Sequence, residues 1–289
     1  MEFLGDRNTG EARLEPSTCL DGIHSRAIRH VDFSPSGRYL SSASFDSVVI
    51  IYELVNNDYQ EFTKIEGHEN EVKCCAFSSC GQYLATCSRD KTVWCWQIDE
   101  EEEFEIAAIF QNHSQDVKFV TWHPHEELIL SCSYDCSIHF YQFDSDEWIL
   151  QQKIEAAHDD TVWAADFSED GEMLVTVGAD HAVKLWTRQK TSWSGESYKW
   201  SKAAVLLVDT RWPLYSVSWN KITKLIAVGG GDGHLRFFEI QRCADILALI
   251  QLAQEEIFPI DINCITWNPV ESNLLAVGLD DGTVRLILL

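Results

Sequence analysis

The sequence predicts an all-β fold in which one small sheet repeats around a ring, and three observations support this. A turn that contains an aspartate recurs six times, at steps of 44, 45, 45, 52 and 49 residues. In the first four copies a histidine precedes this aspartate by 22 residues, a serine or threonine precedes it by four, and an aromatic residue follows it by six. Apolar, strand-like runs flank each turn. This period and pattern are typical of a WD-repeat β-propeller.

The repeats can be followed along the chain by their turns. These are SFDSVVIIY around Asp46, SRDKTVWCW around Asp90, SYDCSIHFY around Asp135, GADHAVKLW around Asp180, GGDGHLRFF around Asp232 and LDDGTVRLI around Asp281. They predict a propeller domain over residues 21–289, with six blades at about 24–53, 68–97, 113–142, 158–187, 211–239 and 261–289.

Each blade is expected to contain four strands. Two runs before the aspartate, such as EVKCCAF and QYLATCS around the turn SSCG, predict the inner strands, and a third run follows the aspartate. The runs are nearly continuous in apolar residues, as in a sheet covered on both faces. Outer strands are expected at 58–64, 105–110, 148–154, 199–208 and 245–252. The last blade has no such run, so Arg13–Leu20, in the N-terminal segment 1–20, is predicted to supply it and close the ring.

The recurring polar residues predict a structural hydrogen-bond network in each of the first four blades. The carboxylate can accept bonds from the histidine and from turn amides, and the histidine can reach the hydroxyl, which meets the aromatic residue; each bond contributes about 0.5–1.5 kcal/mol. A His–Asp–Ser trio also occurs in hydrolases, but fourfold repetition at fixed spacing favours the structural role. The predicted sets are His24, Ser42, Asp46 and Tyr52; His68, Thr86, Asp90 and Trp96; His113, Ser131, Asp135 and Tyr141; and His158, Thr176, Asp180 and Trp186.

The last two blades depart from this pattern. Val228 and Val277 replace the hydroxyl, and Phe238 and Ile287 stand where a polar-tipped ring is found in the other blades. These blades are therefore expected to lack the network and to depend on packing.

Composition excludes several classes of function. The net charge of −24 argues against nucleic acid and against an anionic membrane surface, because both need a basic face. No apolar run is long enough to cross a membrane, and the N-terminus does not resemble a secretory signal. The ten cysteines include no CxxC pair, so they are expected to be reduced, buried thiols, with no metal site and no cofactor.

Several stretches resemble the cytosolic iron–sulfur protein assembly WD-repeat family more closely than they resemble WD repeats at large. They are GHENEVKCCAFSSCGQYLATCSRDKTVWCWQIDEEEEFE and HSQDVKFVTWHPHEELILSCSYDCSIHFYQFDSDEW, continued by HDDTVWAADF and DINCITWNP, and the resemblance covers about residues 22–289. The family is a seven-bladed propeller, and relative to it the first blade is missing, as in a shortened chain or a six-bladed form. Arg211-Trp212 also replaces a histidine-containing loop of the family.

The resemblance implies a non-catalytic scaffold in the cytoplasm, with a nuclear location left open. Its implied partners are a HEAT-repeat adaptor, a small subunit with a reactive cysteine, and client iron–sulfur apoproteins with their C-terminal tails, which end in an aromatic residue. A WD-repeat adaptor of a ubiquitin ligase or signalling complex is the alternative. An enzyme is disfavoured, because no P-loop, metal-ligand spacing or unexplained nucleophile–base pair is found.

The partner-binding surface is expected around one mouth of the central channel. In each blade the start of the inner strand and the residue before the turn aspartate should face this mouth. Cations and aromatic rings suit a peptide that carries a carboxylate and an aromatic side chain. An alternative is that the cations pair with Glu71, Asp116 and other acids in a solvated rim. The candidate residues are Arg29, Phe45, Lys73, Arg89, Lys118, Tyr134, Trp163 and Tyr215, with Arg89 in the family-matched SRDK turn as the first choice.

Three other segments have simpler interpretations. Asp99–Glu103 is an acidic run that predicts a solvated loop, with docking of a basic partner as the alternative. In the 187–210 segment, Trp193 and Trp200 could contact a partner, although Trp200 is expected to pack in the outer strand. Residues 243–256 could form an amphipathic helix, but their place after a third strand favours an outer strand.

Overall fold

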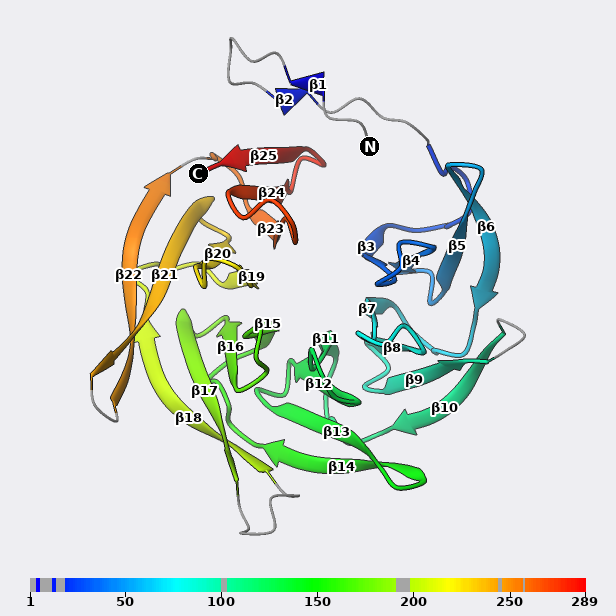
Figure 1. Cartoon of the computed structure of the whole chain (residues 1–289), viewed down its shortest axis with the longest axis horizontal. Coiled ribbons are helices and arrows are strands. Elements are labelled where there is room, and N and C mark those ends of the chain that lie inside the picture. The colour runs from blue at the N-terminus through cyan, green and yellow to red at the C-terminus, as the bar shows by residue number, and fades with distance from the viewer. Residues whose placement is uncertain are drawn as a thin grey trace.

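A computed structural model of the chain describes residues 4–5, 12–13, 19–99, 103–190, 198–243, 246–256 and 258–289. Six antiparallel sheets stand around a central channel, and in each sheet the strands follow one another from the inside outward (Figure 1). The first three sheets consist of β3 (Ile28–Phe33), β4 (Tyr39–Ser44), β5 (Val49–Val55) and β6 (Asp58–Ile65); β7 (Val72–Phe77), β8 (Tyr83–Ser88), β9 (Val93–Ile98) and β10 (Phe104–Phe110); and β11 (Val117–Trp122), β12 (Leu128–Ser133), β13 (Ile138–Asp144) and β14 (Glu147–Ile154).

The other three sheets continue the ring. They consist of β15 (Val162–Phe167), β16 (Met173–Gly178), β17 (Ala182–Lys190) and β18 (Tyr198–Leu207); β19 (Leu214–Trp219), β20 (Ile226–Gly230), β21 (His234–Cys243) and β22 (Ile246–Glu256); and β23 (Ile262–Trp267), β24 (Leu274–Leu279) and β25 (Val284–Leu288). A separate pair, β1 (Leu4–Gly5) and β2 (Ala12–Arg13), precedes them. The prediction of an all-β, six-bladed propeller is confirmed, and all five expected outer strands are present, including β22.

The last blade contains three strands within the described residues. Most of the segment predicted to complete it, residues 14–18, lies outside the described residues, and Arg13 pairs with Leu4 in the β1–β2 pair. The closing strand therefore stays a prediction. Trp193 and most of the acidic run Asp99–Glu103 also lie outside the described residues.

The turn aspartates produce the repeat through local geometry. In every blade the carboxylate accepts the backbone N–H of the residue two positions later, as in Thr92 N to Asp90 Oδ1 at 2.9 Å. The residue in between has a positive φ in all six turns. Asp side chains favour this kind of turn, and the last two blades place Gly233 and Gly282 at the left-handed position, where glycine is unstrained.

The core lies between neighbouring blades, and one of these junctions is open. Five blades bury the aromatic residue that ends the inner strand, with exposures of 7% or less at Phe77, Trp122, Phe167, Trp219 and Trp267. The matching Phe33 is 56% exposed, and Ile28 on the same strand is 49% exposed. On the other side of the gap Val284 is 58% exposed, whereas Val49 at the matching position is 1% exposed. The described part of the ring is thus open between β3 and β25 (Figure 1).

This difference makes a quantitative prediction. We expect Phe33→Ala to lower the free energy of unfolding by less than about 1 kcal/mol, and Phe167→Ala, at the matching buried position, to lower it by about 3–5 kcal/mol. Urea denaturation of both variants measures the two losses. Equal losses would mean that the first blade is covered in solution.

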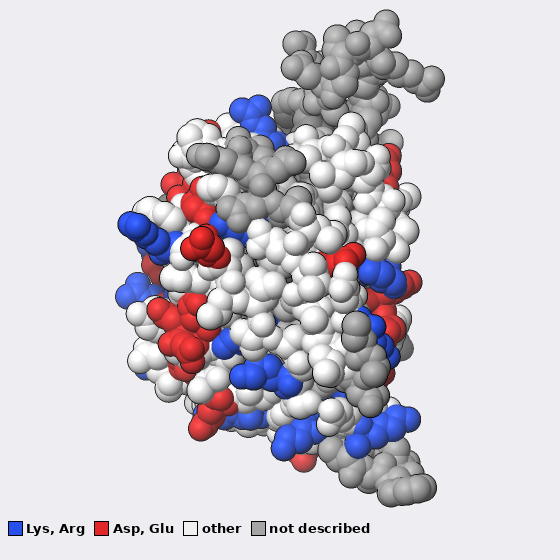
Figure 2. All heavy atoms as spheres, turned by 90° about the vertical axis from the view of Figure 1, so that its left-hand side faces the viewer, with Lys and Arg blue, Asp and Glu red and all other residues white. Residues whose placement is uncertain are grey.

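The outer rim carries charge of both signs. Figure 2 shows the side over β18, β21 and β22, where acidic and basic side chains flank a broad uncharged area. Exposed apolar side chains of β18 and β22 include Val205, Leu207, Ile246 and Leu252.

Candidate partner-binding site at the channel mouth

Backbone hydrogen bonds bring the predicted mouth positions together. In each blade the residue before the turn aspartate donates its N–H to the carbonyl at the start of the inner strand, at 2.9–3.1 Å. Arg89, for example, bonds to Glu71 in this way, and Tyr134 to Asp116. The candidate residues of neighbouring blades therefore lie at one end of the channel, because every blade repeats the same connection.

Glu71 forms the centre of a cationic cluster at this mouth. Lys73 Nζ lies 2.8 Å from its carboxylate, Arg26 Nη2 lies 3.0 Å away and Arg89 Nη1 lies 3.5 Å away. Hydrogen bonds from Lys73 and Arg26 outweigh the effect of burial and lower the pKa of Glu71 to about 2. One carboxylate thus faces three cations, which leaves a positive excess, and the arginine side chains remain 55% and 56% exposed.

Aromatic rings and lysines alternate across the next blades. Lys73 Nζ lies 4.1 Å from the centre of the Phe45 ring. Lys118 Nζ lies 5.3 Å from the ring centres of both Tyr134 and Trp163, and it also pairs with Asp116 at 3.3 Å. Trp163 in turn meets Tyr215 edge to face, with ring centres 5.1 Å apart. Such cation–π contacts pre-arrange rings and charges for an incoming peptide.

Arg29 has a different environment from the other candidate cations. It lines a channel of about 870 Å³ together with Lys73, Lys118, Trp163 and Tyr215. Within the described residues no acid pairs with it, and it is half-buried. The structure therefore shows Lys73 and Lys118 in ion pairs with acids, as the solvated-rim alternative expects, while Arg29 remains available to a ligand carboxylate.

Three mouth residues were not among the candidates. Arg26 donates to the carbonyl of Phe45 at 2.7 Å and lies 5.8 Å from the Phe45 ring centre. Trp212 is 55% exposed beside Tyr215, and Gly231 leaves room for both, since a Cβ there would lie 3.3 Å from each. Asn263 Nδ2 donates to Asp280 at 3.0 Å. Trp212 could have been found, because a tryptophan in a polar turn next to the inner strand is unusual.

The repeated polar residues form the bonds that tie each turn to the inner strands. In the first four blades histidine Nδ1 lies 2.8–3.0 Å from the turn aspartate and Nε2 lies 2.7–2.8 Å from the hydroxyl. Trp96 and Trp186 donate their indole N–H to Thr86 and Thr176 at 3.0 and 2.9 Å. Tyr52 accepts from Ser42 at 3.3 Å.

The third blade adds a second histidine to its network. His139 stacks on His113 with ring centres 3.7 Å apart, and its Nδ1 lies 3.2 Å from the Tyr141 hydroxyl. Burial and the neighbouring His113 lower the pKa of His139 to about 3. His139 is therefore neutral in the folded protein near neutral pH.

The fifth blade lacks the histidine–hydroxyl network of the first four, as expected, but the expectation that it depends on packing alone is wrong. Thr210 takes the place of the histidine and donates to Asp232 at 2.6 Å. Arg236 Nη1 donates to the same carboxylate at 3.0 Å, and Nη2 bonds to the other oxygen. Burial alone would raise the pKa of Asp232, but the bonds from Arg236 and Thr210 outweigh it and lower the pKa to about 2. The charge of a buried arginine thus replaces the missing hydroxyl and histidine. Asp281 in the sixth blade bonds to Thr283 and is exposed.

The cysteine, histidine and acidic side chains are the possible metal ligands of the chain. No group of three such side chains in the described part of the chain is arranged to hold a metal ion. Cys74, Cys75, Cys87, Cys95 and Cys132 are buried, and burial raises the pKa of each thiol. The expectation of buried thiols is wrong for Cys80 and Cys136, which lie in turns, for Cys264, which lines the channel, and for Cys19 before the first blade. Among the described residues there is also no helix with the length and apolar character that a membrane crossing requires.

Comparison with known proteins identifies the repeat. The family model "WD domain, G-beta repeat" matches residues 16–53, 59–97, 104–142, 150–187 and 258–287. These matched ranges leave out the fifth blade. A chain in the crystal structure of the mitotic checkpoint complex superimposes with a TM-score of 0.75 at 17% identity, over 91% of this chain and 74% of that one, and shares the fold.

Two named relatives are similar over nearly the whole chain. The probable cytosolic iron-sulfur protein assembly protein CIAO1 homolog of Caenorhabditis elegans is 48% identical over 278 residues, which cover 95% of this chain and 82% of that protein. The probable cytosolic Fe-S cluster assembly factor of Schizosaccharomyces japonicus is 38% identical over 276 residues, 91% of this chain but 44% of that protein.

Proposed function

Because the chain belongs to the WD-repeat family of cytosolic iron–sulfur protein assembly proteins, we propose that it is a non-catalytic scaffold that binds client apoproteins and brings them to the assembly machinery. In this function the propeller recognises clients and partner subunits, and clusters are transferred by other components. The names of its relatives, which are cytosolic assembly proteins, support a location in the cytosol.

The observation that carries the proposal is the chemistry of the channel mouth. Arg29 has no acidic partner among the described residues, although Glu71 and Asp116 neutralise the lysines of the next two blades. The Trp163–Tyr215 pair lies at the same channel and supplies apolar surface. Trp163 Nε1 is buried with no hydrogen-bond partner among the described residues. A C-terminal peptide with an aromatic last residue offers a carboxylate for the arginine and a ring for these aromatic side chains.

The rest of the ring is available for other partners. A HEAT-repeat adaptor and a small subunit with a reactive cysteine, which the family resemblance implies, would bind outside the mouth if clients occupy it. The exposed apolar side chains of the outer rim are suited to such protein contacts.

Charge reversal at the mouth tests the proposal. We expect Arg89→Glu and Arg29→Glu to weaken binding of a client C-terminal peptide at least about 10-fold, since each adds a negative charge beside the ligand carboxylate. Fluorescence anisotropy with a labelled peptide measures the affinity, and the same peptide with an amidated C-terminus should bind both variants and wild type weakly.

The matched control is Lys153→Glu, which makes the same charge change on outer strand β14, away from the mouth. It should bind the peptide as tightly as wild type does. If both arginine variants fold and retain wild-type affinity, the mouth is not the client site.

A further inference from the structure

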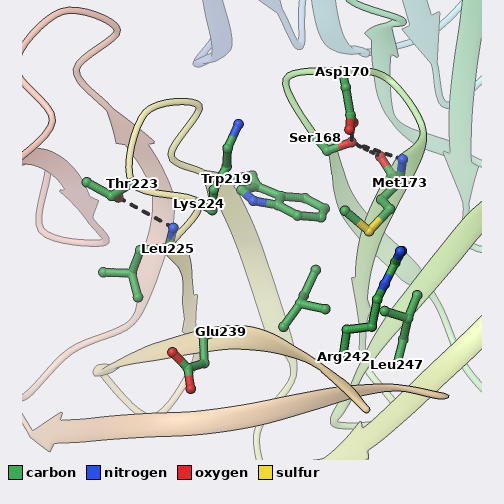
Figure 3. Close-up of a pocket in the computed structure, with 11 residues that line it drawn as sticks. Ser168, Asp170, Met173, Trp219, Thr223, Lys224, Leu225, Glu239, Arg242 and Leu247 are labelled. Carbon is green, nitrogen blue, oxygen red and sulfur yellow. Dashed lines mark hydrogen bonds between the residues drawn. The ribbon is translucent and has the colours of Figure 1, made fainter. Parts of the chain in front are cut away.

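A second cavity lies between the fourth and fifth blades, and it shares no lining residue with the central channel. It has a volume of about 420 Å³, and the apolar part of its lining includes Met173, Trp219, Leu225, Ile240 and Leu247. Figure 3 shows the Trp219 indole between the turn at Ser168–Met173 and the turn at Thr223–Leu225, with Arg242 and Leu247 below it on β21 and β22. The cavity is therefore built from two blades and opens beside the outer hairpin of the fifth.

Matching positions in the other blades explain why this junction is hollow. At the junction of the second and third blades, Tyr83 stacks on Trp122 and meets Trp148 edge to face, with ring centres 5.9 and 5.5 Å apart. Met173 holds the position of Tyr83, seven residues before the turn aspartate. Leu249 holds the position of Trp148, since these residues pair with Ile240 and Phe143 at equivalent points of the third strands.

Among the five blades with an outer strand in the described part of the chain, the fifth is the one whose outer strand has no ring at this point. The outer-strand residues at this position in the first four blades are Tyr59, Phe104, Trp148 and Trp200. Met173 and Leu249 are both smaller than the aromatic residues at these positions in the second junction, so the volume of two rings is not filled. The cavity that remains is larger than the protein cavity of about 150 Å³ that is known to bind benzene.

The inter-blade hydrogen bond of the tryptophan is also missing here. Trp122 and Trp267 donate their indole N–H to Ala76 and Ser218 of the preceding blade, at 2.8 and 3.1 Å. Trp219 occupies the same position, is 2% exposed, and has no hydrogen-bond partner for Nε1 among the described residues. This junction is therefore less complete than its neighbours in polar as well as apolar contacts.

Charged groups at the cavity suit an aromatic ligand with a polar hydrogen. Asp170 uses one oxygen to accept from Ser168 and Glu172, and Glu239 uses one oxygen to accept from Gln241. The second oxygen of each has no partner among the described residues. Arg242 also lines the cavity, with no acid paired to it in the described part of the chain. A carboxylate can accept a phenol or indole hydrogen, while a guanidinium binds the face of a ring.

We propose that this cavity binds a tyrosine or tryptophan side chain of a partner protein. The ring takes the place that Tyr83 and Trp148 occupy inside the second junction, and its polar hydrogen bonds to Asp170 or Glu239. Because the site is separate from the channel mouth, it does not depend on the proposed recognition of client tails.

Small aromatic probes test this directly. We expect indole and N-acetyltyrosinamide to bind with a Kd on the order of 1 mM, as fragments of this size do, and to shift the indole N–H resonance of Trp219 in a saturable way. N-acetylphenylalaninamide, which has no polar hydrogen on its ring, should bind several-fold more weakly. No saturable shift at Trp219 with either polar probe would overturn the proposal.

Variants that fill the cavity give the second part of the test. Met173→Tyr with Leu249→Trp installs the side chains of the second junction and should abolish probe binding. Leu247→Trp should also abolish probe binding, and it should disturb the packing of the core less, because Leu247 is partly exposed. Ile106→Trp on β10, at an exposed position outside the cavity, is its matched control. Probe binding that is equal in wild type and in a folded Leu247→Trp variant would place the probes elsewhere and refute the assignment.

Discussion

Asp232→Ala is expected to lower the free energy of unfolding by about 3–5 kcal/mol, the loss typical of a buried ion pair deprived of one partner. The guanidinium of Arg236 is fully buried, and Asp232 is the carboxylate that accepts from it. Its Nε already has no partner among the described residues. Removal of Asp232 therefore leaves a buried positive charge without compensation on the third strand of the fifth blade. Urea denaturation at pH 7 measures the loss.

The sixth blade provides the matched control. Asp281 holds the same turn position but is exposed and bonds to Thr283, so Asp281→Ala should lower stability by less than about 1 kcal/mol. The double variant Asp232→Ala/Arg236→Met should recover most of the loss, because an apolar side chain can fill the space without a charge. A loss for Asp232→Ala no greater than that for Asp281→Ala would mean that Arg236 finds another partner or reaches water.

The blades could be predicted from sequence because their signals are local. An aspartate two or three residues before a strand, followed directly by a positive-φ residue, determines the turn, and turns every 44–52 residues determine the repeat. The network of the fifth blade was missed because the prediction looked for the same residue types. The sequence did contain another signal, a basic residue four positions after the turn aspartate. In the last three blades this residue is Lys184, Arg236 or Arg285. Lys184 and Arg236 form ion pairs with the aspartates of their blades.

The sequence also explains which cations at the mouth are paired with an acid, although the prediction did not use this information. Side chains two residues apart on a strand point to the same face, so Glu71 reaches Lys73, and Asp116 reaches Lys118. In the first blade this position holds Ala27, so Arg29 has no acid beside it. The open junction between β3 and β25 could not be read from any residue, because Phe33 matches its buried counterparts in type and differs from them only in its neighbours.

The folded protein is expected to lose stability in two stages as the pH falls. The first stage comes from buried histidines. Burial lowers the pKa of His30 to about 4, burial and His113 lower that of His139 to about 3, and burial lowers that of His158. In the unfolded chain these histidines take up protons near pH 6.5. Between about pH 6.5 and 4 the unfolded state therefore binds more protons than the folded state, and the free energy of unfolding decreases as the pH is lowered. Asp32 opposes this in part, because burial raises its pKa to about 6 and it takes up a proton in the folded state first.

The second stage comes from the turn aspartates. Burial alone would raise the pKa of Asp90, but hydrogen bonds from His68 and Thr92 lower it to about 2, and Asp232 also has a pKa of about 2. Both carboxylates are fully ionised in the folded protein above the unfolded value of about 3.9, so the stability they add is present above pH 4 and is lost as pH falls towards 2. For each, roughly 2 kcal/mol disappears in this window, a large part of the 5–15 kcal/mol typical of a folded domain.

Two variants separate the stages in urea denaturation at a series of pH values. His139→Phe removes one group of the first stage, and the slope of stability against pH between 6.5 and 4 should become smaller than in wild type. Asp90→Asn should be less stable than wild type at pH 7 by about 1–3 kcal/mol, because the histidine and the turn amides lose a charged acceptor. That difference should shrink steadily below pH 4 and fall to a small fraction of its pH 7 value near pH 2, where about half of Asp90 in the folded wild type is protonated. A difference that stays constant from pH 7 to pH 2 would show that the contribution of Asp90 does not depend on its charge.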